Sequence, residues 1–201
     1  MSPREPNRRG VLLGLAGAAV HPAGLAADAV DERLLYRLLA QPDGVVLLMR
    51  HASAPGGGDP PGFRLDDCAT QRNLSDEGRE QARRIGERLR ALRPQGLSIA
   101  AVWHSQWCRA RETAELLAVG VTRPQPLFNS FFDDPDGTRE QRFATQARTL
   151  LAAWAGPGAL LVVTHQVNIT ALSGVFPASG EMVAMRWGNS AGAEVLGRLV
   201  L

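Results

Sequence analysis

Lysine is absent from this chain of 201 residues, so all 22 of its basic residues are arginine. The absence excludes Schiff-base chemistry on a lysine and a phosphate-binding loop that carries one. Any phosphate must therefore be bound by arginine, histidine or backbone amides. Cysteine is scarce as well, because Cys68 and Cys108 are too few for a disulfide scaffold or a four-cysteine zinc site.

The chain also lacks a convincing apolar stretch of about 18 or more residues, which a membrane-spanning helix would need. It has little net charge, since 20 acidic residues balance the 22 basic ones, and therefore no global basic field for nucleic acid. The hydrophobic content of 45% is ordinary for a globular protein and suffices for a full core. The length predicts one domain with at most a short appendage.

Residues 1–27 have the order of features found in a secretory signal. Three arginines precede an apolar stretch at 11–20, and small residues follow it. Residues 7–12 (NRRGVL) are similar to a twin-arginine export motif that lacks its phenylalanine. We expect cleavage near Ala27 and a periplasmic or secreted domain of residues 28–201. The alternative is an N-terminal segment that is disordered or packs on the core as a helix.

Apolar runs alternate with amphipathic stretches along the rest of the chain. Continuous apolar runs at 45–49, 99–103 and 160–163 predict strands that are covered on both faces. The alternation predicts an α/β fold, a three-layer sandwich with a mostly parallel central sheet and helices on both faces. The other expected elements are helices at 31–40, 75–92, 109–118 and 139–154 and strands at 181–186 and 194–201.

Arginine and histidine side chains follow the three apolar strands. Arg50 and His51 follow the first strand. His104 ends the second, Arg109 opens the helix after it, and His165 follows the third. Because parallel strands deliver their carboxyl ends to one edge of a sheet, we expect these groups to lie together. Two arginines and two histidines form a site for a dianion, with one histidine as a nucleophile that the arginines keep unprotonated.

Four short motifs follow one another along this part of the chain. Residues 47–52 (LLMRHA) resemble a strand that ends in Arg-His-Gly, with Ala52 in place of the glycine. Residues 74–82 (LSDEGREQA) resemble Leu-Thr-x-x-Gly-x-x-Gln-Ala, and residues 105–114 (SQWCRARETA) match Ser-x-x-x-Arg-Ala-x-x-Thr-Ala. Residues 162–165 (VVTH) end a further strand with the second histidine. In this order, the motifs resemble those of the histidine phosphatase (phosphoglycerate mutase-like) superfamily.

This resemblance implies hydrolysis of phosphomonoesters through a covalent phosphohistidine intermediate, with no metal and no cofactor. It implies that His51 is the phosphorylated nucleophile and that Arg50 and Arg109 hold the phosphoryl oxygens. His165 would complete the pocket and stabilise the transition state. The expected partner is a small phosphorylated substrate and not a nucleic acid. The physiological substrate and the oligomeric state stay open.

The proton donor for the leaving group is where the chain departs from this family. The family's glutamate in a Leu-x-Glu segment corresponds to Asn129, which has no acidic proton to donate. Asp133 and Asp134 lie close to it in sequence and are the candidate donors. Residues 133–137 (DDPDG) fit a plain turn equally well. A substrate with a good leaving group would not need the acid.

A segment rich in glycine and proline, residues 54–67, follows the nucleophile and is placed to cover the site. Arg64 within it and Arg72 beyond it are either substrate ligands or solvated side chains. Cys68 and Cys108 form an even pair, and in an oxidising compartment we expect them to be joined by a disulfide. Two buried free thiols are the alternative.

Two other classes of function stay open on the sequence. A zinc-dependent hydrolase would use His51, His104 and His165 as ligands together with an aspartate. A catalytically inactive relative would bind phosphate or a phosphosugar without turnover. Sensitivity to a chelator distinguishes the zinc enzyme, and phosphate binding without turnover distinguishes the inactive relative.

Overall fold

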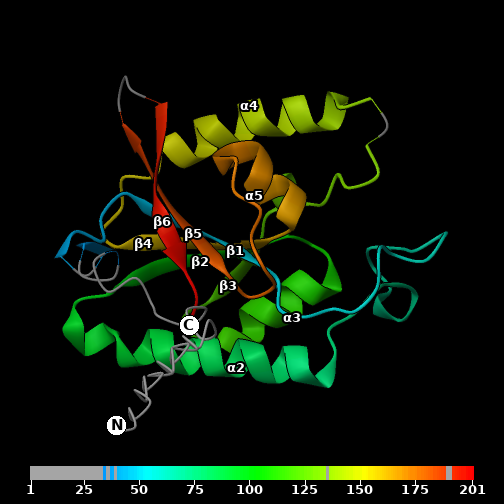
Figure 1. The fold of residues 1–201 in the computed structure, drawn as a ribbon, viewed down its shortest axis with the longest axis horizontal. Coiled ribbons are helices and arrows are strands. Elements are labelled where there is room, and N and C mark those ends of the chain that lie inside the picture. The colour runs from blue at the N-terminus through cyan, green and yellow to red at the C-terminus, as the bar shows by residue number, and fades with distance from the viewer. Residues whose placement is uncertain (1–33, 35–36, 39, 135, 189–191) are drawn as a thin grey trace, which may run out of the picture.

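The computed structural model describes residues 34, 37–38, 40–134, 136–188 and 192–201 (Figure 1). The expected export signal at 1–27 lies outside these residues. The helix expected at 31–40 lies partly outside them, and its described residues are helical. Among the described residues, no helix is long and apolar enough to cross a membrane.

A six-stranded sheet forms the middle layer of the molecule, in the strand order β3-β2-β4-β1-β5-β6 (Figure 1). The first four strands in this order are parallel, whereas β5 and β6 pair in the antiparallel sense. The expected mostly parallel sheet is therefore confirmed, and the three apolar strands are its central neighbours. The strands are β1 (Val45–Arg50), β2 (Ile99–His104), β3 (Thr122–Pro124), β4 (Ala159–Thr164), β5 (Met182–Gly188) and β6 (Gly192–Leu199).

Helices cover both faces of this sheet, as the three-layer prediction requires. In Figure 1, α2 (Asp76–Ala91) and α3 (Cys108–Leu117) lie on one face, and α4 (Thr138–Ala152) and α5 (Gln166–Ser173) lie on the other. Helix α2 begins one residue inside the expected range, because Ser75 caps it: its side chain accepts a hydrogen bond from the backbone N–H of Gly78. Short 3₁₀ helices at Cys68–Thr70, Arg93–Gln95 and Pro126–Phe128 complete the elements.

Strand β1 is buried on both sides, and its alternating side chains divide between two hydrophobic clusters. Leu47 and Met49 pack in the cluster that includes α2 and α3, whereas Val46 and Leu48 pack in the cluster that includes α4 and α5. Leu47 also pairs with Leu161 of β4 on one side and with the antiparallel β5 on the other. The end of β1 is therefore held in place by the core and by two neighbouring strands.

Two glycines let α2 approach the backbone of its neighbours very closely. A Cβ atom at Gly78 would lie 2.0 Å from the carbonyl oxygen of Ser53, in the segment that follows β1. A Cβ atom at Gly86 would lie 2.1 Å from the carbonyl oxygen of Leu117 at the end of α3. A side chain at either position would therefore force the facing backbone to move.

Candidate active site

A cavity of about 310 Å³ lies where β1 and β4 end and α3 begins. Charged, imidazole and aromatic side chains line it, together with the glycines at 56–58. The expected site residues Arg50, His51, Arg109 and His165 all belong to this lining. The other side chains that concern the chemistry are Asp59, Phe63, Arg72, Trp107, Phe132 and Asp133.

The ring of His51 is buried, and one of its nitrogens is already bonded. Nδ1 lies 2.8 Å from the carbonyl oxygen of Ala52. Because a carbonyl oxygen only accepts hydrogen bonds, Nδ1 carries the proton and Nε2 keeps its lone pair. Burial lowers the pKa of His51 to about 3, and three neighbouring arginines add to this effect, while the hydrogen bond to Ala52 opposes it. The imidazole is thus neutral at pH 7, and burial contributes more to this than the arginine repulsion expected from the sequence.

His165 faces His51 across the cavity, with ring centroids 5.5 Å apart and the rings in an edge-on arrangement. Its Nε2 lies 2.7 Å from Oγ of Ser105, the first residue after β2. Burial lowers the pKa of His165 well below its ordinary value, and the proximity of His51 and of the arginines lowers it further. The second histidine is therefore also neutral and is oriented by a serine.

Three arginines bring positive charge to the cavity. Arg50 donates to the carbonyl oxygen of Pro177 at 2.9 Å, and Arg72 donates to the carbonyl oxygen of Ala54. The Nε atoms of Arg50, Arg72 and Arg109 are buried and have no hydrogen-bond partner among the described residues. A buried donor without a partner costs free energy, so these N–H groups are available to an anion. Of the two arginines left undecided above, Arg72 lines the cavity.

The other undecided arginine, Arg64, lies at the surface. Its guanidinium forms ion pairs with Asp66 and Asp67, and its side chain is 64% exposed. It does not line the cavity, so the solvated alternative holds for Arg64.

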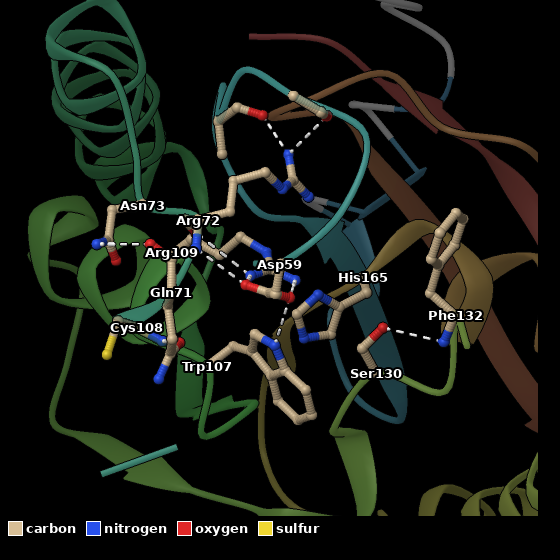
Figure 2. A network of polar contacts seen from close by, with 12 residues as sticks. Asp59, Gln71, Arg72, Asn73, Trp107, Cys108, Arg109, Ser130, Phe132 and His165 are labelled. Carbon is tan, nitrogen blue, oxygen red and sulfur yellow. Dashed lines mark hydrogen bonds and ion pairs between the residues drawn. The ribbon is translucent and has the colours of Figure 1, made fainter. Parts of the chain in front are cut away.

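Asp59, which the sequence patterns did not indicate, forms an ion pair with Arg109. Nη1 and Nη2 of Arg109 donate to Oδ1 and Oδ2 of Asp59 at 2.8 and 3.1 Å (Figure 2). Nε1 of Trp107 and the backbone N–H of Arg72 each donate to the same carboxylate at 3.0 Å. Burial alone would raise the pKa of Asp59, but the hydrogen bonds from Arg109 and its neighbours lower it overall. Asp59 is the one charged residue in the glycine- and proline-rich stretch at 55–62, and this is the feature of the sequence that could have indicated it.

Cys68 and Cys108 are joined by a disulfide, as expected. The bridge ties the segment that follows His51 to the first turn of α3, next to Arg109. The side chain of Gln71 strengthens this connection, because its Oε1 accepts from the backbone N–H of Cys108 at 2.9 Å. The ring of Phe63 also contacts Trp107, with centroids 5.5 Å apart. The loop that borders the cavity is thus attached to α3 at several points.

The two carboxylates proposed as proton donors have different positions. Asp133 lines the cavity, but its side chain is 77% exposed and forms an ion pair with Arg139 at 3.1 Å. Asp134 does not line the cavity, and instead accepts from the backbone N–H of Glu140 at 3.0 Å. Asn129 links two loops, since its Oδ1 accepts a hydrogen bond from the backbone N–H of Gln106 at 2.8 Å. Only one of the two aspartates, Asp133, therefore reaches the site.

His104 is buried away from the cavity, with Nδ1 2.8 Å from the carbonyl oxygen of Ser105. In the described part of the chain, no three histidine, cysteine, aspartate or glutamate side chains are grouped so that they could hold a metal ion. The zinc alternative, which needed His51, His104 and His165 as ligands, has no such ligand set there.

Comparison with known proteins agrees with this geometry. The model of the histidine phosphatase superfamily (branch 1) matches residues 46–128. No curated protein sequence matches the chain. Among solved structures, the protein histidine phosphatase SixA complexed with tungstate has 17% identity and a TM-score of 0.51, over 77% of this chain and 96% of that one.

Two further structures have the same fold. The mycobacterial glucosyl-3-phosphoglycerate phosphatase has 17% identity and a TM-score of 0.55, over 75% of this chain and 96% of that one. A candidate alpha-ribazole-5'-P phosphatase from Escherichia coli has 18% identity and a TM-score of 0.54, over 79% and 97%. At these identities the likeness concerns the fold. Residues 46–128 are thus similar to the histidine phosphatase superfamily, and the chain shares its fold with these three structures.

Proposed function

We propose that this protein hydrolyses small phosphomonoesters through a phosphohistidine on His51, without a metal ion. One observation carries the proposal. The neutral ring of His51, fixed at Nδ1 by Ala52, lies in a cavity with three arginines whose Nε groups are buried and unpartnered. A nucleophile with a free lone pair and a set of cationic donors are what phosphoryl transfer requires.

In the proposed reaction, Nε2 of His51 attacks phosphorus while the bond from phosphorus to the ester oxygen breaks. Arg50 and Arg109 hold the non-bridging oxygens, and His165 stabilises the charge that develops on them. A carboxylic acid at the cavity gives its proton to the leaving oxygen. Water then attacks the phosphohistidine, the P–N bond breaks, and the carboxylate takes up the proton of the water. The products are an alcohol and inorganic phosphate.

The comparisons support this proposal through the family match and through neighbours whose names describe phosphatases. We also propose that residues 1–27 direct export and that residues 28–201 form the mature domain. The disulfide between Cys68 and Cys108 supports this part, because disulfides persist in oxidising compartments such as the periplasm. Cell fractionation with N-terminal sequencing of the mature protein tests it, and a cytosolic protein with an intact N-terminus contradicts it.

The activity is tested with p-nitrophenyl phosphate in excess chelator, for the wild type, His51→Asn and a matched control, His104→Asn. His104 is also a buried histidine at a strand end, but it does not line the cavity. We expect chelator-resistant turnover in the wild type and in the control, and none in His51→Asn. Mass spectrometry after rapid acid-free quenching should find the phosphoryl group on His51. Turnover that the chelator abolishes contradicts the proposal, and phosphate binding without turnover favours the inactive relative.

A further inference from the structure

We propose that Asp59 is the acid that protonates the leaving group, a role that rests on the phosphohistidine reaction proposed above. Asp59 lies in the loop that follows the nucleophile and lines the same cavity as His51. Its side chain is only 11% exposed. The carboxylate is therefore inside the site, whereas that of Asp133 is largely in solvent.

The contacts of Arg109 show how a substrate would change the surroundings of Asp59. Both terminal nitrogens of Arg109 donate to the Asp59 carboxylate in a paired arrangement (Figure 2). Two oxygens of a phosphoryl group are matched to the same paired donors. Because each N–H group serves one partner, a phosphoryl group that takes this pair of donors displaces the carboxylate.

Asp59 stays close to the phosphoryl group after this exchange. The backbone N–H of Arg72 and Nε1 of Trp107 donate to its two oxygens independently of Arg109. The disulfide at Cys68 and the contact of Phe63 with Trp107 hold the same loop against α3. The displaced carboxylate therefore has little distance to move and remains beside the reacting ester.

The exchange also supplies a reason for the carboxylate to take up a proton. In the free protein, the Arg109 guanidinium and two further N–H donors stabilise the Asp59 anion. In the complex, the neighbour of Asp59 is a phosphate dianion, which repels a carboxylate and favours the neutral acid. Substrate binding thus converts Asp59 from a partner of Arg109 into a proton donor.

The proton then moves in a balanced cycle. As the P–N bond to His51 forms and the P–O bond breaks, the proton of Asp59 passes to the leaving oxygen, and an alcohol departs. Asp59 is now a carboxylate beside the phosphohistidine. It accepts a proton from the attacking water as the P–N bond breaks, which restores the acid and releases phosphate.

The test compares leaving groups that differ in their need for a proton. We measure kcat/KM with p-nitrophenyl phosphate, phenyl phosphate and β-glycerol phosphate for the wild type and for Asp59→Asn. For the variant, we expect a loss of about 10²- to 10⁴-fold with β-glycerol phosphate, the usual contribution of a general acid, and roughly tenfold or less with p-nitrophenyl phosphate. Asp66→Asn is the matched control, since Asp66 is in the same loop but its side chain is 88% exposed.

Other outcomes overturn the assignment. An equal loss with all three substrates means that Asp59 only positions Arg109, and a gain with all three means that it only blocks the site. If Asp133→Asn shows the selective loss instead, Asp133 is the donor.

If Asp59→Asn does not fold, the wild type alone still provides a test. With the acid in place, kcat/KM should depend weakly on the pKa of the leaving group, and a steep dependence overturns the proposal. Failure of the underlying reaction is recognised separately, because the wild type then forms no phosphohistidine from p-nitrophenyl phosphate. Phosphohistidine in both the wild type and Asp59→Asn, with no selectivity for the leaving group, rejects only the role of Asp59.

Discussion

Two regions of different construction meet at the cavity. Arg50, His51 and His165 stand at the ends of β1 and β4, which are buried and paired in register. Asp59 and Phe63, by contrast, belong to a loop with no α-helix or extended strand, which an ion pair, a ring contact and a disulfide attach to α3. The sheet thus fixes His51 and His165, whereas the position of the loop depends on a few side-chain contacts.

The largest effect should come from a strand-end group. Arg50→Ala removes a cationic donor from the cavity, and we expect kcat/KM for p-nitrophenyl phosphate to fall about 10²- to 10³-fold. Arg83→Ala is the matched control, because Arg83 is on α2, is half exposed and pairs only with Glu80 in the described structure. Steady-state kinetics of the two variants measure the difference. Similar small losses in both would mean that the strand-end cation contributes no more than surface charge.

The disulfide should have the next largest effect, and its loss should weaken mainly the loop region. Replacing Cys68 and Cys108 together by serine removes a cross-link between residues 40 apart, and we expect a loss of about 3 kcal/mol in the free energy of unfolding. Urea unfolding of the oxidised wild type and of the double variant measures this loss. KM should rise while phosphorylation of His51 persists. Unchanged stability and KM would show that the other loop contacts suffice.

The two close glycines of α2 offer a sharper comparison of site and scaffold. Gly78→Ala and Gly86→Ala should each cost about 1–3 kcal/mol of stability, because each new Cβ meets a carbonyl oxygen near 2 Å. Ser53, which faces Gly78, lies two residues after His51, whereas Leu117, which faces Gly86, lies at the end of α3. We therefore expect kcat to fall in Gly78→Ala and to persist in Gly86→Ala at a temperature where both are folded. Equal kcat values would show that the catalytic segment tolerates the shift.

Lowering the pH should have the smallest effect on the free energy of unfolding, and it acts through the buried histidines at the strand ends. The pKa of His51 is about 3 in the folded protein and near 6.5 in the unfolded chain. Between these values the unfolded chain binds a proton that the folded protein excludes, so stability present above pH 6.5 is lost as the pH falls. His51→Asn removes this contribution, and its unfolding free energy should fall less steeply, by about 1 kcal/mol between pH 6.5 and 5.5. Parallel urea curves across this range would contradict a buried neutral His51.

The sequence predicted those parts of the molecule that are encoded locally. The apolar runs of β1, β2 and β4 and the capped, amphipathic α2 were recognisable because their patterns are written in consecutive residues. Strand β3 was missed because it has three residues, one of them Pro124, and none is fully buried. Helix α5 was missed because it is short and lacks a clear polar face.

The proposed proton donor, Asp59, is the part of the site that the sequence did not indicate. Asp133 and Asp134 were chosen for their place near Asn129, but the nearly buried Asp134 bonds to the beginning of α4. The ion pair of Asp59 with Arg109 joins residues 50 apart in the sequence. No local pattern encodes such a pair, because it exists only once the loop is folded onto α3.

The pairing of β1 has a consequence for the order in which the molecule can form. Val46 pairs with Leu160 on one side and with Met185 on the other. Strand β1 is therefore synthesised well before β4 and β5, the two strands with which it pairs. Contacts so distant in sequence are slow to form, because a long loop must close first. A nascent chain that has not yet emerged as far as β4 carries the Arg-His motif without its supporting sheet. It should therefore have the proposed nucleophile, His51, but no capacity to bind phosphate.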